Sequence, residues 1–167
     1  IPHGEIPGRM DFALRQVGIE DLRERTIASL SGGQRQKVAI ASVIALRPRI
    51  LVLDEPTGEL DPASSRQIFS LLKALNEDYG ITVIIIEQKI MLLCEFARHL
   101  LVLDHGEVFR QGDTRDVLAH AEELKALGVN CPRVSGLSQL LRARTGEDLP
   151  ICVNLEEAEA MVRGLMK

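Results

Sequence analysis

Two runs made almost entirely of aliphatic residues, 50–53 and 81–86, stand out in the middle of the chain, and Thr82 is the one polar residue in them. Apolar runs of this kind are typical of parallel strands that are buried on both faces. Between them, apolar residues recur at helical spacing, at positions Ile68, Leu71, Leu72 and Leu75. Asp61 is a good N-cap for this helix, and Gly80 ends it. Residues 50–86 therefore predict one right-handed βαβ unit.

A second pattern lies upstream, where the polar stretch 30–36 precedes an apolar run over 38–46. Ser31 is placed as an N-cap, and Gln34, three residues on, can complete a capping box. The predicted helix ends just before Pro48, which disfavours helical geometry in the residue before it. Two glycines in the first turn each cost about 1 kcal/mol relative to alanine. They do, however, allow close approach to the N–H groups of a helix N-terminus, where anions bind.

The remaining pattern is mostly helical and divides the chain into three parts. We expect helices at 10–17, 90–97, 114–118, 121–127, 135–142 and 155–166, and strands at 100–103 and 107–110. The sequence predicts an α/β fold with a helical part over 1–49, an α/β core over 50–119 and a helical extension over 120–167.

Composition and charge narrow the classes of partner. The chain of 167 residues has 20 basic and 24 acidic side chains, a net charge of −4, one Tyr, four Phe and no Trp. With no basic stripe and few aromatics to stack on bases, we expect no nucleic-acid partner. The apolar run 38–46 is far too short for a membrane span. Cys94, Cys131 and Cys152 are widely spaced, so we expect reduced thiols in a cytoplasmic protein and no structural metal.

The residues best placed for chemistry are Asp54 and Glu55, at the end of the first predicted strand. In open α/β sheets, ligands bind beyond the carboxyl ends of the strands. Two acids in one pocket repel each other, which can raise the pKa of one toward a value useful for acid–base chemistry.

Two motifs in order resemble those of ATP-binding-cassette (ABC) ATPases. Leu30-Ser31-Gly32-Gly33-Gln34 resembles the LSGGQ signature, and the stretch 50–58 follows at the family's usual distance with its Walker B strand. The resemblance implies a partial P-loop NTPase-type sheet, the C-terminal part of an ABC nucleotide-binding domain. Residues 1–49 would hold part of the helical signature subdomain, and 50–119 the core from Walker B to the switch loop.

The resemblance also implies roles for single residues. Asp54 would hold Mg²⁺ through water, and Glu55 would be the general base that polarises the attacking water. Counting along the second strand puts Gln88 at the family's switch histidine, where it can hydrogen-bond but cannot become charged. Asp61 lies in the D-loop, in which Gly58 and Glu59 depart from the family's usual Ser-Ala.

In this family the signature acts in trans, over the ATP held by a second subunit. The resemblance therefore implies that Ser31, Gly32, Gly33 and Gln34 bind a partner's ATP, and that ATP and Mg²⁺ are the cofactors. No phosphate-binding loop of the form GxxxxGK[S/T] occurs in the chain. We expect the chain to correspond to the C-terminal part of an ABC ATPase, with a gap beside strand 82–87. Alone, it should bind ATP weakly and not hydrolyse it.

The tail over 122–141 resembles the extension of energy-coupling-factor and cobalt-type importer ATPases. It favours an importer subunit for a micronutrient, either a vitamin or cobalt or nickel. The subunit would act as a dimer with a second ABC ATPase subunit, identical or different, beneath transmembrane transporter subunits on the cytoplasmic face of the membrane. A non-transport ABC ATPase, and a non-catalytic ABC-like chain that pairs with an intact ATPase, are the alternatives.

Overall fold

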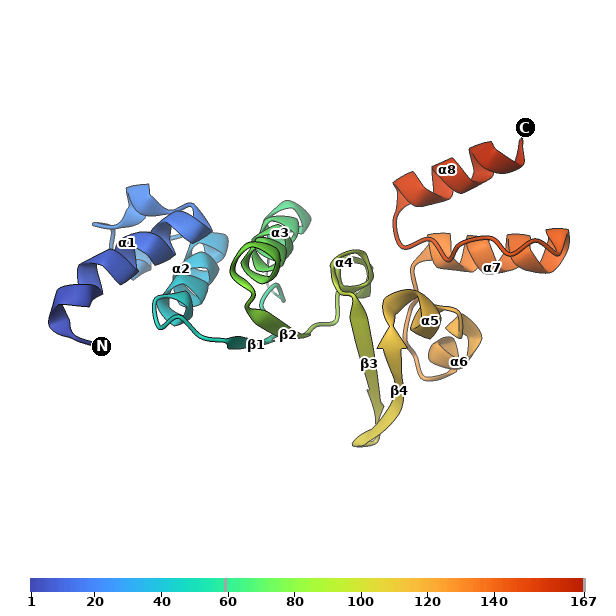
Figure 1. The fold of residues 1–167 in the computed structure, drawn as a ribbon, viewed down its shortest axis with the longest axis horizontal. Coiled ribbons are helices and arrows are strands. Elements are labelled where there is room, and N and C mark those ends of the chain that lie inside the picture. The colour runs from blue at the N-terminus through green and yellow to red at the C-terminus, as the bar shows by residue number, and fades with distance from the viewer. Residues whose placement is uncertain (59, 167) are drawn as a thin grey trace. The chain divides into compact units, whose positions relative to one another are not determined.

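The computed structural model of the chain describes residues 1–58 and 60–166 (Figure 1). These residues form two compact units, Ile1–Gln88 and Lys89–Lys167, which we call the signature unit and the C-terminal unit. Each unit has its own helices and its own two-stranded sheet. Among the described helices, none has the length and hydrophobicity that a membrane span requires.

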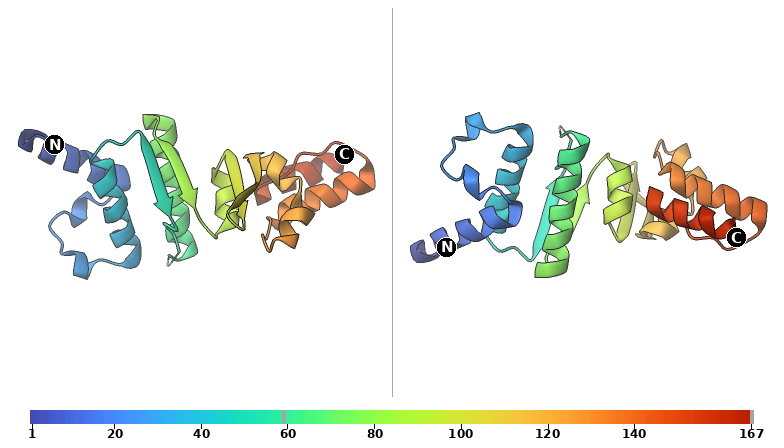
Figure 2. Two further views of the ribbon diagram at one scale, coloured as in Figure 1. Left: turned by 90° about the horizontal axis from the view of Figure 1, so that it is seen from below. Right: turned by 90° about the horizontal axis from the view of Figure 1, so that it is seen from above.

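The signature unit is built from helices packed on a parallel pair of strands (Figure 2). Its elements are α1 (Ile6–Val17), α2 (Gly32–Ile44), β1 (Ile50–Asp54), α3 (Pro62–Tyr79) and β2 (Thr82–Ile86), with short 3-10 turns at His3–Glu5, Glu20–Leu22 and Ile27–Ser29. Local residues set the helix ends. Asp61 caps α3 by accepting the N–H groups of Ala63 and Ser64, and Gly80 ends it at a φ of 64°.

The predicted βαβ connection is present, because β1 and β2 pair in parallel with Val52 opposite Ile84 and α3 runs between them. Among the described residues, β2 pairs with no strand other than β1. The core of the unit lies between the helices and one face of this sheet. Its most buried side chains are Ile40, Ile44, Leu51, Ile68, Leu72 and Leu75.

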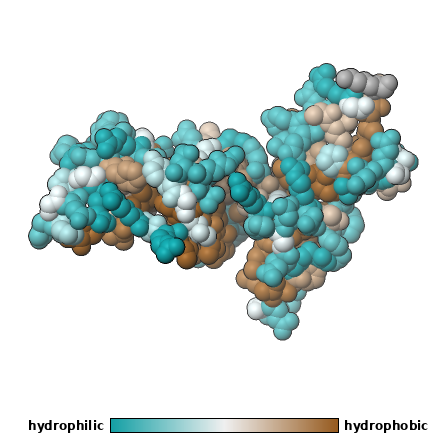
Figure 3. Space-filling view, viewed as in Figure 1, coloured by the Kyte–Doolittle hydropathy of each residue, from teal (hydrophilic) through white to brown (hydrophobic). Residues whose placement is uncertain are grey.

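The opposite face of the β1–β2 sheet is uncovered, and here the prediction of burial on both faces is wrong. The exposed fractions of Ile50, Val52, Ile84 and Ile86 are 58%, 61%, 49% and 57%, whereas Leu51 on the covered face is 2% exposed. Figure 3 shows hydrophobic surface on the side of the unit where these strands lie. The physical reason is that a strand is buried on both faces only when both faces have a layer packed on them.

The C-terminal unit combines an antiparallel hairpin with a group of short helices. Its elements are α4 (Ile90–Phe96), β3 (His99–Asp104), β4 (Glu107–Asp113), α5 (Thr114–Leu118), α6 (Ala121–Ala126), α7 (Arg133–Thr145) and α8 (Leu155–Leu165). The hairpin turns at His105 and Gly106, which have φ values of 46° and 83°. A bulge between Val102 and Leu103 shifts the register of the pair.

The segment before α8 is held by buried polar contacts. Ser135 and Ser138 are fully buried on α7 and bond the backbone of Cys152, at 2.7 Å to its carbonyl oxygen and 3.1 Å from its N–H. Arg115 of α5 forms a bidentate pair with Glu157 of α8, at 2.9 and 2.8 Å. These contacts fix α7, α8 and α5 against one another through side chains, because little regular backbone pairing joins them.

The Arg115–Glu157 pair should make the stability of the C-terminal unit depend on pH. The hydrogen bonds from Arg115 hold the pKa of Glu157 below its ordinary value of 4.5, so the pair stabilises the folded state above about pH 4.5 and is lost as the pH falls through the lower folded pKa. We expect Glu157→Gln to lower the free energy of unfolding by about 1 kcal/mol at pH 7, a value kept small by solvent screening.

This effect is measured by denaturant unfolding of both proteins between pH 3 and 7. The difference should shrink toward zero at the acid end. Glu156→Gln, at an exposed position in the same helical turn, is the matched control and should change little at any pH. A Glu157→Gln difference that stays constant over this range would contradict the role of the pair.

Candidate functional site

The signature residues lie at the first turn of α2, in the geometry that the sequence predicts. Ser31 is the N-cap and its hydroxyl oxygen accepts the N–H of Gln34 at 3.3 Å, while the Gln34 side-chain oxygen accepts the N–H of Ser31 at 3.0 Å. Both halves of the capping box are therefore formed. Because Gln34 uses its oxygen in this bond, its amide NH₂ group is turned away from the cap.

The two glycines of this turn are not required by the chain's own structure. Gly32 and Gly33 lie in α2, and neither has a positive φ. A Cβ at Gly32 would meet Leu60 Cδ2 at 3.8 Å, and one at Gly33 would meet Ser64 Oγ at 3.4 Å, which are contacts that a folded protein accommodates. Packing within this chain therefore does not explain why two residues that destabilise a helix stand at its start. Because glycine has no Cβ, a group from outside the chain can approach the backbone closely here.

Asp54 is the last residue of β1 and shares its uncovered face. The burial pattern of β1 alternates, and Asp54 falls on the exposed side together with Ile50 and Val52. It lies opposite Ile86 in the strand register. No hydrogen bond or ion pair joins its carboxylate to another described residue. Its oxygens are thus available to an external donor or cation.

Glu55 and Gln88, from the ends of the two strands, are brought into direct contact. The Gln88 side-chain amide donates to Glu55 Oε1 at 2.5 Å, across 33 positions of sequence. Glu55 has a φ of 44°, which is unusual for a residue with a side chain and is typical of functional turns. Its N–H donates to the Ile86 carbonyl at 2.8 Å, and the Gly58 N–H donates to its carbonyl at 3.2 Å, so both neighbours hold this conformation.

Glu87 is a site residue that sequence reasoning missed. Its Oε2 accepts the N–H of Thr57 at 3.2 Å and the Thr57 hydroxyl at 2.5 Å, while its Oε1 accepts the N–H of Gln88 at 3.0 Å. Thr57 is fully buried. The Glu87 carboxylate therefore links the turn after β1 to the end of β2, which are the two segments that carry Glu55 and Gln88. The only signal in the sequence is an acid that ends an apolar run.

Asp61 is confirmed as the cap of α3. Its Oδ1 accepts the N–H groups of Ala63 and Ser64, each at 3.0 Å. The hydrogen bond from the Ser64 side chain is the largest of the contacts that hold the pKa of Asp61 below its usual value, so the carboxylate is charged at neutral pH. Within the D-loop, Glu59 lies outside the described residues, and the D-loop role of Asp61 in a dimer stays a prediction.

Comparison with known proteins decides the family. Residues 5–58 match the family model described as ABC transporter. The chain is 41% identical over 150 residues to the energy-coupling factor transporter ATP-binding protein EcfA1 of Caldanaerobacter subterraneus, which covers 90% of this chain and 53% of that protein. It is 36% identical over 146 residues to EcfA3 of Clostridium perfringens, covering 87% and 51%. The chain belongs to the ABC transporter ATPase family.

Solved ABC structures share this fold. CbiO1 from Clostridium perfringens, described as part of the ABC transporter complex CbiONQ, has a TM-score of 0.68 at 36% identity and covers 82% of this chain and 55% of CbiO1. The cassette MJ0796, solved as a dimer bound to ADP and Pi, has a TM-score of 0.59 at 34% identity over 69% of this chain and 50% of that chain. The predicted α/β fold of a partial ABC cassette is confirmed.

This ABC chain spans about half the length of these relatives. The resemblance to energy-coupling-factor and cobalt-type ATP-binding proteins is confirmed as well. The GxxxxGK[S/T] loop is not found among its 167 residues.

Proposed function

We propose that this chain is the signature-bearing part of an ATP-binding subunit in an ABC importer. In this proposal Ser31, Gly32, Gly33 and Gln34 bind the phosphates of an ATP molecule held by a second ATPase subunit. The observation that carries it is the pair of glycines at the start of α2, which neither φ nor internal packing requires. Without Cβ atoms, a phosphate can reach the first N–H groups of the helix and the positive end of its dipole.

The ends of β1 and β2 fit the metal and acid–base roles of the family. Asp54 offers an exposed carboxylate with no described partner, and it would hold Mg²⁺ through water, with phosphate oxygens and further waters completing the coordination. When bound, the ion neutralises charge on the phosphoryl group. Glu55 would act as general base toward the attacking water. The Gln88 amide orients one Glu55 oxygen without titrating itself, and leaves the other oxygen available.

The uncovered face of β1 and β2 supports the proposal that another polypeptide layer, which carries the phosphate-binding loop, packs on this sheet. It presents four half-exposed aliphatic side chains, and Asp54 lies on the same face. A polypeptide carrying the GxxxxGK[S/T] loop would bury these side chains and set its bound nucleotide beside Asp54. We therefore expect the chain alone to bind ATP weakly and to show no ATP turnover. Turnover equal to that of a complete relative would contradict this.

The names of the relatives support a transport role. Proteins called energy-coupling factor transporter ATP-binding proteins share 34–41% identity with the chain, and CbiO1 belongs to a transporter complex. On this basis the chain would work beneath transmembrane subunits, on the cytoplasmic face of the membrane, in uptake of a vitamin or of cobalt or nickel. The transmembrane partners would choose the substrate.

A second candidate is a non-catalytic subunit that completes the ATP site of an intact ATPase. Gln88 at the place of the switch histidine favours it, since an amide cannot become an imidazolium. The signature turn would have the same role in both cases. They differ in whether Glu55 ever acts on a nucleotide.

The test is ATP-dependent association with a complete ATPase. The chain is mixed with a full-length relative such as EcfA1, whose own catalytic glutamate is replaced so that ATP is not consumed, and the complex is measured by analytical ultracentrifugation with ATP, with ADP and without nucleotide. We expect a complex with ATP only. Equal association in all three conditions, or none, would overturn the proposal. Recovery from cells with ribosomes or DNA, rather than with integral membrane proteins, would overturn the transport role.

A further inference from the structure

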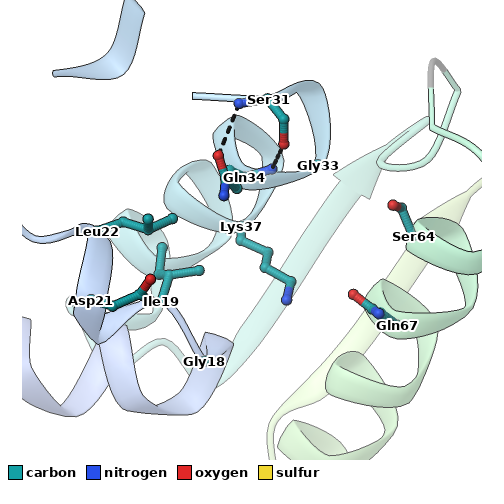
Figure 4. A pocket seen from close by; sticks show the side chains of 10 residues that line it. All are labelled: Gly18, Ile19, Asp21, Leu22, Ser31, Gly33, Gln34, Lys37, Ser64 and Gln67. Atoms are coloured by element: carbon teal, nitrogen blue, oxygen red, sulfur yellow. Dashed lines mark hydrogen bonds between the residues drawn. The ribbon is translucent and has the colours of Figure 1, made fainter. Parts of the chain in front are cut away.

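One cavity lies beside the signature turn and belongs to the site described above, since Figure 4 shows Ser31, Gly33 and Gln34 among the residues that line it. A second cavity, of about 570 Å³, lies within the C-terminal unit. Its volume is in the range of cavities that bind small molecules. No described residue of the signature, of β1 or of β2 lines this second cavity. The role proposed above therefore does not account for it.

The second cavity is a cleft between α5 and α8. Residues three and four positions apart share one side of a helix, and each helix supplies such a set. The sets are Arg115, Asp116 and Ala119 from α5 and its C-cap, and Glu157, Ala160 and Met161 from α8. Ile151 and Met161 are buried, so the inner wall of the cleft is apolar, whereas Ala119 and Ala160 are exposed and lie at its mouth.

Two of the charged groups on the walls neutralise each other. Arg115 donates two hydrogen bonds to the Glu157 carboxylate, at 2.9 and 2.8 Å, and one to the Ile151 carbonyl oxygen. Glu157 Oε2 also accepts the N–H of Val153 at 3.1 Å. The pair runs from α5 to α8, so it holds the two walls of the cleft together. Both of its charges are satisfied within the chain.

Two other charged groups of the cleft are not satisfied in this way. Arg142 of α7 donates through Nε to the Leu149 carbonyl, and its Nη2 lies 3.2 Å from Asp148 Oδ1. The Asp148 side chain is 97% exposed, so water screens that pair. Arg142 Nη1 forms no hydrogen bond with a described residue, and the Asp116 carboxylate has no partner among the described residues. The cleft therefore presents one cationic and one anionic group beside an apolar wall.

We propose that this cleft binds a small zwitterion, an α-amino acid with an aliphatic side chain. Arg142 would donate to its carboxylate, Asp116 would accept from its ammonium group, and its side chain would lie against Ile151 and Met161. Asp116 would repel an anion and Arg142 would repel a cation, whereas a zwitterion pairs with both. The site goes beyond the proposed function, because it needs neither ATP nor a second subunit.

The test compares three molecules with the same aliphatic group, titrated into the whole chain by isothermal titration calorimetry. They are leucine, 4-methylpentanoate, which lacks the ammonium group, and 3-methylbutylamine, which lacks the carboxylate. We expect saturable binding of leucine and binding about tenfold weaker or more for the other two, because each meets a like charge and leaves one group of the cleft unpaired. The absence of leucine binding would overturn the proposal, as would equally tight binding of either of the other two molecules.

Variants place the ligand in the cleft. Asp116→Asn and Arg142→Gln should each weaken leucine binding about tenfold or more, because each removes a charge-assisted contact. Arg144→Gln, at an exposed position of the same helix, is the matched control and should bind leucine normally. Circular dichroism checks the fold of each variant, and Asp116→Asn is the safer of the two charge variants because no described residue bonds its carboxylate.

Ala160→Leu tests the position of the ligand without a change of charge. Leucine suits a helix almost as well as alanine, so α8 should keep its structure while the larger side chain fills the mouth of the cleft. Leucine in solution should raise the Tm of the unchanged chain, because a ligand stabilises the folded state that binds it, and should not raise the Tm of Ala160→Leu. Leucine binding that both Asp116→Asn and Ala160→Leu leave unchanged would overturn the site, whatever the outcome of the association test.

Discussion

Replacing Gly33 by aspartate is expected to weaken ATP-dependent association with a complete ABC ATPase by roughly a hundredfold or more. The new carboxylate would point at the phosphate that the signature turn is proposed to bind, and like charges facing each other across an interface cost several kcal/mol. The fold should survive. The nearest atom to a Cβ at this position is Ser64 Oγ at 3.4 Å, and an acid in the first turn of a helix is favoured by its dipole.

Two further variants make this result specific. Gly33→Ala adds only a methyl group and should have a much smaller effect, which would separate charge from bulk. Glu55→Gln should leave association unchanged, because Glu55 lies at the end of β1 and not on α2. Analytical ultracentrifugation with ATP measures all three. If Gly33→Asp associates as well as the unchanged chain, α2 does not face a phosphate in trans.

Replacing Glu87 by alanine is expected to destabilise the signature unit by about 2–4 kcal/mol. The Thr57 N–H and hydroxyl would lose a shared charged acceptor at a fully buried position, and hydrogen bonds to charged groups contribute about 1.5–3 kcal/mol each. The turn that holds Glu55 at its positive φ would loosen with them. Denaturant unfolding of the chain measures the loss, and a change in the denaturant slope would signal that two-state behaviour has failed.

Glu87→Gln is the informative companion, because it keeps an oxygen acceptor and removes the charge. We expect it to recover about half of the lost stability. Glu77→Ala, which removes an exposed side chain paired with Lys73 at 4.0 Å, is the control and should cost only about 0.3–0.5 kcal/mol. A Glu87→Ala protein as stable as the control would show that the carboxylate does not hold the Thr57 turn.

The parts of this protein that local sequence predicts are those whose contacts are short in sequence. The capping box joins Ser31 and Gln34 across three positions, and the Asp61 cap reaches Ala63 and Ser64 two and three positions on. Gly80 ends α3 because it adopts a left-handed conformation at low cost. These helix starts and ends depend only on residues that are close in sequence. Helix starts and ends were therefore predicted to within a few residues.

The pairs of residues that form the candidate site are, in contrast, far apart in sequence. Counting along the second strand placed Gln88 at its end, but its bond to Glu55 depends on the register in which β1 meets β2. The bond between Thr57 and Glu87 spans 30 positions and had no signal in the pattern of hydrophobic and polar residues. A one-residue slip between the strands would turn these side chains to opposite faces, so only the paired structure determines them.

The sequence by itself determined the helix caps, the βαβ order and the two motifs that identify an ABC ATPase. The tertiary structure alone decided which face of the β1–β2 sheet is covered and that Asp116 and Arg142 line the same cleft. The reason is that the hydrophobicity of a side chain shows only that its burial would be favourable, whereas actual burial requires another element to pack on it. Ile50, Val52, Ile84 and Ile86 are as apolar as the buried Leu51, yet they are exposed because no described element packs on them.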